Sequence, residues 1–162
     1  MEACPRPSVL IVYYSFSQQT ERVASVIAQR LEVRGADVAT ARIEFTDRRW
    51  SKRFESIPMR FPLLKIIGML PAQVRQQTGE IRIPPDAVTG GYDLVVIGSP
   101  TWWFRVCVPI RSYLKAPAAQ RAMAGTPFAG YSTSRRYWKR NVGDIKRLAR
   151  RMAGAGSVGR TS

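Results

Sequence analysis

Hydroxyl and amide side chains gather in one short segment that follows an apolar run near the N-terminus. The segment is Ser15-Phe16-Ser17-Gln18-Gln19-Thr20, and apolar residues at helical spacing begin just after it. Hydroxyls, amides and the free backbone N–H groups of a helix N-terminus suit a phosphate dianion, because all are donors and the helix dipole favours negative charge. The segment has no lysine, so it is not a nucleoside triphosphatase loop. A polar loop that caps a helix without any ligand is the alternative.

Two later segments also combine hydroxyls with aromatic or basic residues. They are Ser99-Pro100-Thr101-Trp102-Trp103-Phe104 and Ser132-Thr133-Ser134-Arg135-Arg136-Tyr137, and each follows a candidate strand. Three consecutive aromatic residues cannot all point into one core, so at least one should be exposed and able to stack on a planar ring. The alternative is a hydrophobic loop that packs beneath its own helix.

The composition excludes several kinds of chemistry. The 162 residues include no histidine and two cysteines, Cys4 and Cys107. A Ser-His or Cys-His nucleophile pair and an imidazole metal site are therefore impossible, and the wide cysteine spacing excludes a thiolate zinc cluster or a CxxC redox pair. Two thiols without a disulfide framework, together with a start that does not resemble a signal peptide, lead us to expect a cytoplasmic protein.

The apolar pattern predicts strands that alternate with helices, in one domain spanning residues 1–162. Strands are expected near Val9–Tyr14, Val38–Ile43, Leu94–Gly98 and Pro127–Tyr131. Helical spacing follows the first, third and fourth of these, with the last helix around Val142–Met152. The segment Asp47–Asp86 holds five prolines and is expected to be an irregular excursion (residues 47–86), with a helix within Phe61–Gln76 that Pro71 breaks.

Together these features resemble the flavodoxin-like FMN-binding family, which includes flavodoxins and NAD(P)H-quinone reductases. The likeness lies in Ile11 to Thr20 with Ala24 beyond, and in Tyr92–Ser99 followed by Pro100-Thr101-Trp102-Trp103. It implies an α/β fold with an open parallel sheet in the order 2-1-3-4 and helices on both faces. A fifth strand is expected to be short or missing, because only Gly154–Ser162 follows the last predicted helix.

The resemblance also implies FMN as the cofactor and a site made by the three polar segments. The phosphate would be held by Ser15, Ser17, Gln18, Gln19 and Thr20, one side of the ring by Pro100, Thr101, Trp102 and Trp103, and its other side by Ser132, Thr133 and Arg136. The expected function is electron transfer or FMN-dependent reduction of a small acceptor such as a quinone, with Arg105, Arg135 or Arg136 able to stabilise an anionic reduced flavin.

One position departs from the family pattern. Gln18 stands where the family has a glycine, so a backbone with positive φ would be strained there. The alternative is a different turn, with the Gln18 amide as an added phosphate donor.

Positive charge dominates the chain and is concentrated in its last third. Lysine and arginine total 26 against 11 acidic residues, a net charge of +15, and residues 105–162 hold thirteen basic residues and one acid. A cofactor-free basic binding module with the same fold, contacting an anionic membrane or nucleic acid, is therefore the alternative function. Nucleic acid is the less favoured partner, whereas peripheral membrane contact through Arg48–Leu70 is compatible with redox work on a quinone.

A missing fifth helix would have structural consequences. We expect apolar side chains of Val9–Tyr14 and Leu94–Ile97 to lie partly bare and the fourth strand to keep an unpaired edge. Both features favour association, so a homodimer, or a chain stabilised by FMN, is expected.

Overall fold

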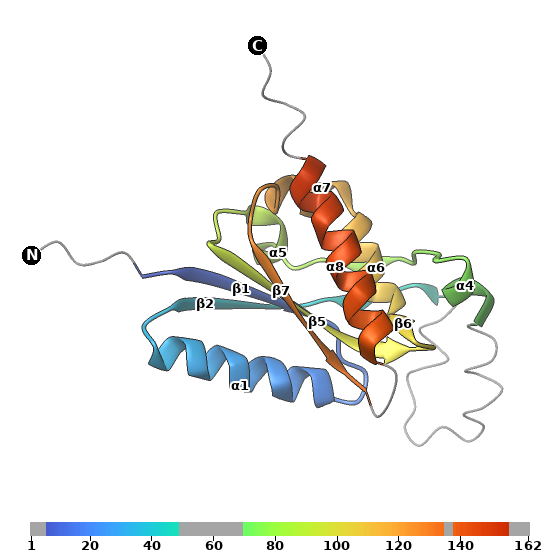
Figure 1. Ribbon diagram of the computed structural model, residues 1–162, viewed down its shortest axis with the longest axis horizontal. Coiled ribbons are helices and arrows are strands. Elements are labelled where there is room, and N and C mark those ends of the chain that lie inside the picture. The colour runs from blue at the N-terminus through green and yellow to red at the C-terminus, as the bar shows by residue number, and fades with distance from the viewer. Residues whose placement is uncertain (1–5, 49–69, 135–137, 156–162) are drawn as a thin grey trace, which may run out of the picture.

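A parallel sheet lies at the centre of the computed structural model, which describes residues 6–48, 70–134 and 138–155 (Figure 1). Its parallel strands follow the order β2-β1-β5-β7. They span Ser8–Tyr13 (β1), Asp37–Arg42 (β2), Leu94–Trp102 (β5) and Phe128–Thr133 (β7). The expected order 2-1-3-4 is confirmed. The main difference is that β5 continues through Trp102, where β6 (Arg105–Val106) returns antiparallel to it.

Helices cover both faces of the sheet, as expected. One face packs against α1 (Gln19–Val33), through Ala24 and Ala28. The other face packs against α5 (Asp86–Thr89), α6 (Val108–Lys115), α7 (Pro117–Ala122) and α8 (Trp138–Ala155). Within the described residues no fifth parallel strand follows α8, and residues 156–162 lie outside them.

The two apolar runs of the sequence form the central strands because both of their faces are buried. Val9, Ile11 and Val96 face α1, whereas Leu10 and Val12 face the opposite helices. A strand covered on both faces has no solvent side, so its sequence is apolar throughout rather than alternating.

The sheet face shared with α1 is not left bare, and that expectation was wrong. Val9, Ile11 and Val96 are at most 7% exposed. Ala24 and Ala28 are small enough to let α1 approach the sheet closely, and the ring of Tyr131 covers the adjoining part of β5. A side chain at Gly98 would overlap that ring, so the glycine makes room for it. The expected unpaired edge of the fourth strand is confirmed for the described residues, in which β7 pairs only with β5.

The excursion at residues 47–86 is described in part. Its flanks pair as a small antiparallel ladder of β3 (Glu44–Phe45) and β4 (Ile81–Arg82). The helix expected within Phe61–Gln76 is described only as α4 (Leu70–Val74), because residues 49–69 lie outside the described part. Pro71 is the second residue of α4, where a proline is tolerated because its missing N–H has no helical partner. None of the helices in the described part is long and apolar enough to cross a membrane.

Replacing Gly98 with alanine tests the packing of Tyr131 on the sheet. The added methyl group would collide with the ring, so we expect Gly98→Ala to lower the free energy of unfolding by about 1–3 kcal/mol. Gly143, inside α8, has open space around it, so Gly143→Ala should instead stabilise the chain by about 0.5–1 kcal/mol. Urea denaturation measures both changes. A neutral Gly98→Ala variant would contradict this packing.

Candidate functional site

The three polar segments meet at one edge of the sheet. Tyr13, Gly98 and Tyr131 are neighbours in register across β1, β5 and β7. Because these strands are parallel, the residues after each of these positions emerge at the same edge, where parallel sheets of this kind bind ligands.

Pairs of hydroxyl groups connect the segments to one another. Thr20 Oγ1 lies 2.8 Å from Thr133 Oγ1, which joins the first segment to the third. Thr101 Oγ1 lies 2.9 Å from Ser132 Oγ, which joins the second segment to the third. The Tyr131 hydroxyl also donates to the Thr20 carbonyl at 2.9 Å. Residues from all three segments are therefore in direct contact. Of the predicted site residues, Arg135 and Arg136 lie outside the described part.

The first segment presents donors around the start of α1. Ser17, Gln18 and Gln19 are exposed, and α1 begins without a side-chain cap. The first helical hydrogen bond runs from Arg22 N–H to the Gln18 carbonyl (2.9 Å), so the three preceding N–H groups have no helical acceptor. Ser15 is 3% exposed, and its Oγ has no hydrogen-bond partner among the described residues.

Gln18 adopts the backbone of the glycine that it replaces. Its φ of 61° and ψ of −5° are left-handed, so the different turn considered above is not used. A left-handed residue other than glycine costs about 1–2 kcal/mol. The segment therefore keeps the glycine-type geometry despite the glutamine.

The second segment forms a strained hairpin turn between β5 and β6. Trp103 and Phe104 lie between the paired residues Trp102 and Arg105, and both have positive φ, 49° and 64°. Two-residue hairpins with positive φ at both positions usually carry Asn-Gly, so two aromatic residues there are costly, by about 1–3 kcal/mol each.

The three aromatic residues of this segment lie in different surroundings. The ring of Trp102 is half-buried and meets Tyr14 edge-on, at a centroid distance of 5.6 Å. Trp103 is also half-buried, whereas Phe104 is 41% exposed, which confirms that at least one of the three is exposed.

A pocket of about 500 Å³ opens beside this hairpin. Phe104 and the first turn of α8, Trp138-Lys139-Arg140, line it. The sequence analysis did not place Trp138, Lys139 or Arg140 in the flavin site and counted the two cations only toward the basic charge of the alternative function. Their mix of aromatic and basic residues just after the third segment was a usable signal. Arg105 pairs with Asp144 at 3.4 Å, so an acid partly offsets its charge.

Asn141 holds the second and third segments together from α8. It is fully buried, and its Nδ2 lies 2.8 Å from Thr101 Oγ1 and 2.9 Å from Ser132 Oγ. Its Oδ1 has no partner among the described residues. Sequence reasoning missed it, although a polar residue four positions before Ile145 on the apolar stripe of a helix signals a buried hydrogen-bonding role.

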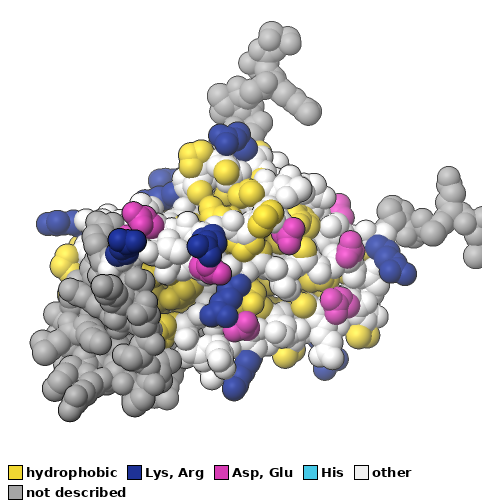
Figure 2. Space-filling model, turned by 180° about the vertical axis from the view of Figure 1, so that it is seen from behind, with side chains coloured by type: hydrophobic (Ala, Val, Ile, Leu, Met, Phe, Trp, Pro, Cys, Tyr) yellow, Lys and Arg dark blue, Asp and Glu magenta, His cyan; other side chains and the backbone are white. Residues whose placement is uncertain are grey.

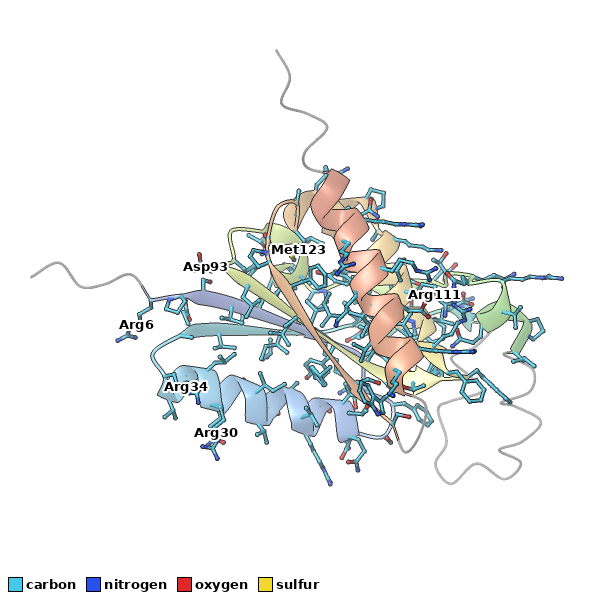
Figure 3. All side chains as sticks on the ribbon, viewed as in Figure 1. Arg6, Arg30, Arg34, Asp93, Arg111 and Met123 are labelled. Carbon is cyan, nitrogen blue, oxygen red and sulfur yellow. The ribbon has the colours of Figure 1, made fainter. Side chains whose placement is uncertain are left out.

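Buried polar groups also fix the base of the hairpin. Arg111 is 1% exposed and donates to the carbonyls of Val106 (2.8 Å) and Gln77 (3.0 Å), and burial lowers the pKa of its guanidinium (Figure 3). The Cys107 N–H donates to Ser99 Oγ at 3.2 Å, and burial raises the pKa of the Cys107 thiol to about 11. Cys107 is thus a neutral structural thiol at neutral pH and no nucleophile.

Replacing Gln18 with glycine tests the left-handed turn. Gln18→Gly should raise the free energy of unfolding by about 1 kcal/mol, because glycine adopts this backbone without steric cost. Gln19→Gly, one residue later and inside α1, should lower it by up to about 1 kcal/mol. Chemical denaturation of the two variants decides the matter: equal losses would mean that Gln18 is not left-handed.

Removing the Asn141 amide tests its contacts between the two segments. Asn141→Ala should lower the free energy of unfolding by about 1–3 kcal/mol, because two half-buried hydroxyls lose the amide group that donates to them. Lys146→Ala, at an exposed position of the same helix, should change it by less than about 0.5 kcal/mol. If thermal or urea unfolding gives the same change for both, Asn141 does not hold the segments.

Comparison with solved structures finds flavoproteins with a similar fold. A flavoprotein from Lactobacillus acidophilus, solved in complex with FMN, has a TM-score of 0.67 at 20% identity, covering 88% of this chain and 86% of that one. A WrbA-like flavodoxin from Agrobacterium tumefaciens has a TM-score of 0.57 at 13% identity (91% and 74%). An archaeal flavodoxin has 0.52 at 15% (90% and 74%).

The sequence comparisons found no relative of this chain. No protein-family model and no curated protein matches the sequence. The structural likeness and the strand order together establish that the chain has a flavodoxin-like fold.

Proposed function

We propose that this chain binds FMN where β1, β5 and β7 end, and that it works as an electron carrier or as an FMN-dependent reductase of a small acceptor such as a quinone. The observation that carries the proposal is the unpartnered Oγ of Ser15, which is buried beside the uncapped start of α1. A buried hydroxyl without a partner is uncommon, because it forfeits a hydrogen bond that water would supply. A phosphate at this position would provide the acceptor.

The residues around Ser15 fit a phosphate group. The exposed Ser17, Gln18 and Gln19 and the N–H groups of the first turn of α1 are all donors, and the helix dipole favours negative charge there. The left-handed backbone at Gln18 supports the same reading, since strain of this kind is concentrated at ligand sites.

The second segment, the third segment and the start of α8 together fit a planar ring. Phe104 and Trp138 supply aromatic surface to the adjacent pocket, and its volume lies in the range of small-molecule sites. Thr101 and Ser132 lie together at the end of β5 and β7, with polar atoms that orient a ligand. Asn141 fixes both hydroxyls, so the ring side of the site is pre-organised.

The chain's own residues would bind and orient the cofactor and set its electrostatic surroundings. Bound FMN would supply the electron chemistry, so no side chain has to act as a general acid or base. Lys139 and Arg140 line the pocket and would stabilise negative charge that develops there. The chain has no histidine, and this division of work needs none.

A second function is favoured by one observation, the exposed basic residues along α8. On this reading the chain is a cofactor-free basic module that contacts an anionic membrane surface. A titration with flavin separates the two functions, because a cofactor-free module would bind no flavin. Among the described residues β7 has no further strand at its outer edge, and that edge would also allow a homodimer in either case.

Flavin titration of a Ser15 variant tests the proposal. The wild-type chain should bind FMN more tightly than riboflavin, which lacks the phosphate. Ser15→Ala should weaken FMN binding about ten- to a hundred-fold, the worth of a hydrogen bond to a charged acceptor, and leave riboflavin binding unchanged. Flavin fluorescence quenching measures each dissociation constant.

The control is Ser25→Ala, at an exposed hydroxyl of α1 that donates to its own helix. This variant should bind both flavins like the wild type. A wild-type chain that binds neither flavin, or both equally, would overturn the phosphate site.

A further inference from the structure

The exposed side of α8 carries a dense row of positive charge. Its cations are Lys139, Arg140, Lys146, Arg147, Arg150 and Arg151, and all of them are exposed. The single acid of the helix, Asp144, is buried and ion-paired, at 2.8 Å from Arg147 and 3.4 Å from Arg105. Asp144 therefore offsets only a small part of this charge.

The folding of the helix does not require these charges. The first turn of α8 carries Lys139 and Arg140 and no acid, although the helix dipole disfavours cations at this end. Neither residue contributes to the core, because both side chains are exposed. The helix dipole therefore disfavours both cations, and the core does not need them, so we infer that they serve binding and not folding.

The row of cations begins at the candidate site. Lys139 and Arg140 line the pocket together with Phe104 and Trp138. From Lys139 to Arg151 the helix rises about 18 Å, which is far longer than a small anion and comparable with one side of a protein contact. On the reverse side of the molecule, by contrast, acidic and basic side chains are interspersed (Figure 2).

We propose that the redox partner of this site is a protein with an acidic face, which docks on α8 and at the mouth of the pocket. This inference rests on the proposed FMN function, because an electron partner must approach the flavin. Opposite charges would steer the partner to the pocket and fix its orientation, and they accelerate association at low salt. We call the six cations of α8 the docking row.

Small oxidants of opposite charge probe the field at the flavin directly. The FMN-loaded chain is reduced and then mixed in a stopped-flow instrument with anionic hexacyanoferrate(III) or cationic hexaammineruthenium(III). Either oxidant takes one electron, so two are consumed per reduced flavin. Neutral FMNH2 releases two protons in this oxidation, and its anion FMNH− releases one. The rate with the anion should fall as salt is added, and the rate with the cation should rise, because salt screens attraction and repulsion alike.

A double variant at the pocket, Lys139→Glu/Arg140→Glu, should slow the anionic oxidant by about ten-fold or more at low salt. Acids in the first turn favour the helix, so misfolding would not explain the loss. The control is Arg30→Glu/Arg34→Glu, which changes the net charge equally at the far end of α1 (Figure 3). It should stay within about two-fold of wild type. Equal effects of the two double variants, or no salt dependence, would overturn the proposal.

Macromolecular probes decide the nature of the partner. Fluorescence anisotropy compares a labelled glutamate peptide with a thymidine oligonucleotide of equal negative charge, on the FMN-loaded chain. The peptide should bind at least as tightly as the oligonucleotide, and Lys146→Glu/Arg150→Glu should weaken it about ten-fold. Tighter binding of the oligonucleotide, or no binding of the peptide, would contradict an acidic protein partner.

The experiments distinguish a failure of the proposed FMN function from a failure of the docking row. A chain that takes up no flavin, seen from its visible absorption, would overturn the FMN site and this inference with it. A chain that holds FMN but shows no difference between the two oxidants would overturn the docking row alone.

Discussion

Parallel pairing of β1, β5 and β7 brings the ends of three strands to one edge of the sheet, and the candidate site depends on this pairing. Tyr13, Gly98 and Tyr131 lie in one row across the strands. The segments that follow are then close enough for hydroxyl pairs and the Asn141 amide to connect them. A shift of one residue in the register of β7 would turn Tyr131 to the other face and separate these groups.

Three of the four non-glycine residues with positive φ in the described part lie in the segments that surround the site. Gln18, Trp103 and Phe104 have left-handed backbones without being glycine, and such positions cost about 1–3 kcal/mol each. The buried core and the hydrogen bonds of Arg111 beneath the hairpin hold these conformations in place. The arrangement exchanges stability for fixed backbone conformations in these segments, which is useful where a ligand must be bound in one pose.

Sequence reasoning was most successful where a residue pattern had a single physical solution. Runs buried on both faces indicated β1 and β5, and helical spacing indicated α1, α6 and α8, whereas the strand order came from the family resemblance. The expectation of an uncovered sheet face was wrong. It was based on the missing fifth helix and did not consider how closely α1 approaches the sheet through small residues such as Ala24 and Ala28. Asn141 and Trp138 each carried a sequence signal, but their partners Thr101 and Phe104 lie more than thirty residues away, and the sequence alone does not show those contacts.

A crystal structure of the chain grown with FMN would test the central claim most directly, because that claim is about position. The account predicts the phosphate within hydrogen-bonding distance of Ser15 Oγ at the start of α1. It also predicts the ring at the ends of β5 and β7, beside the pocket lined by Phe104 and Trp138. FMN bound elsewhere on the chain, or bound with its phosphate away from Ser15, would contradict the account.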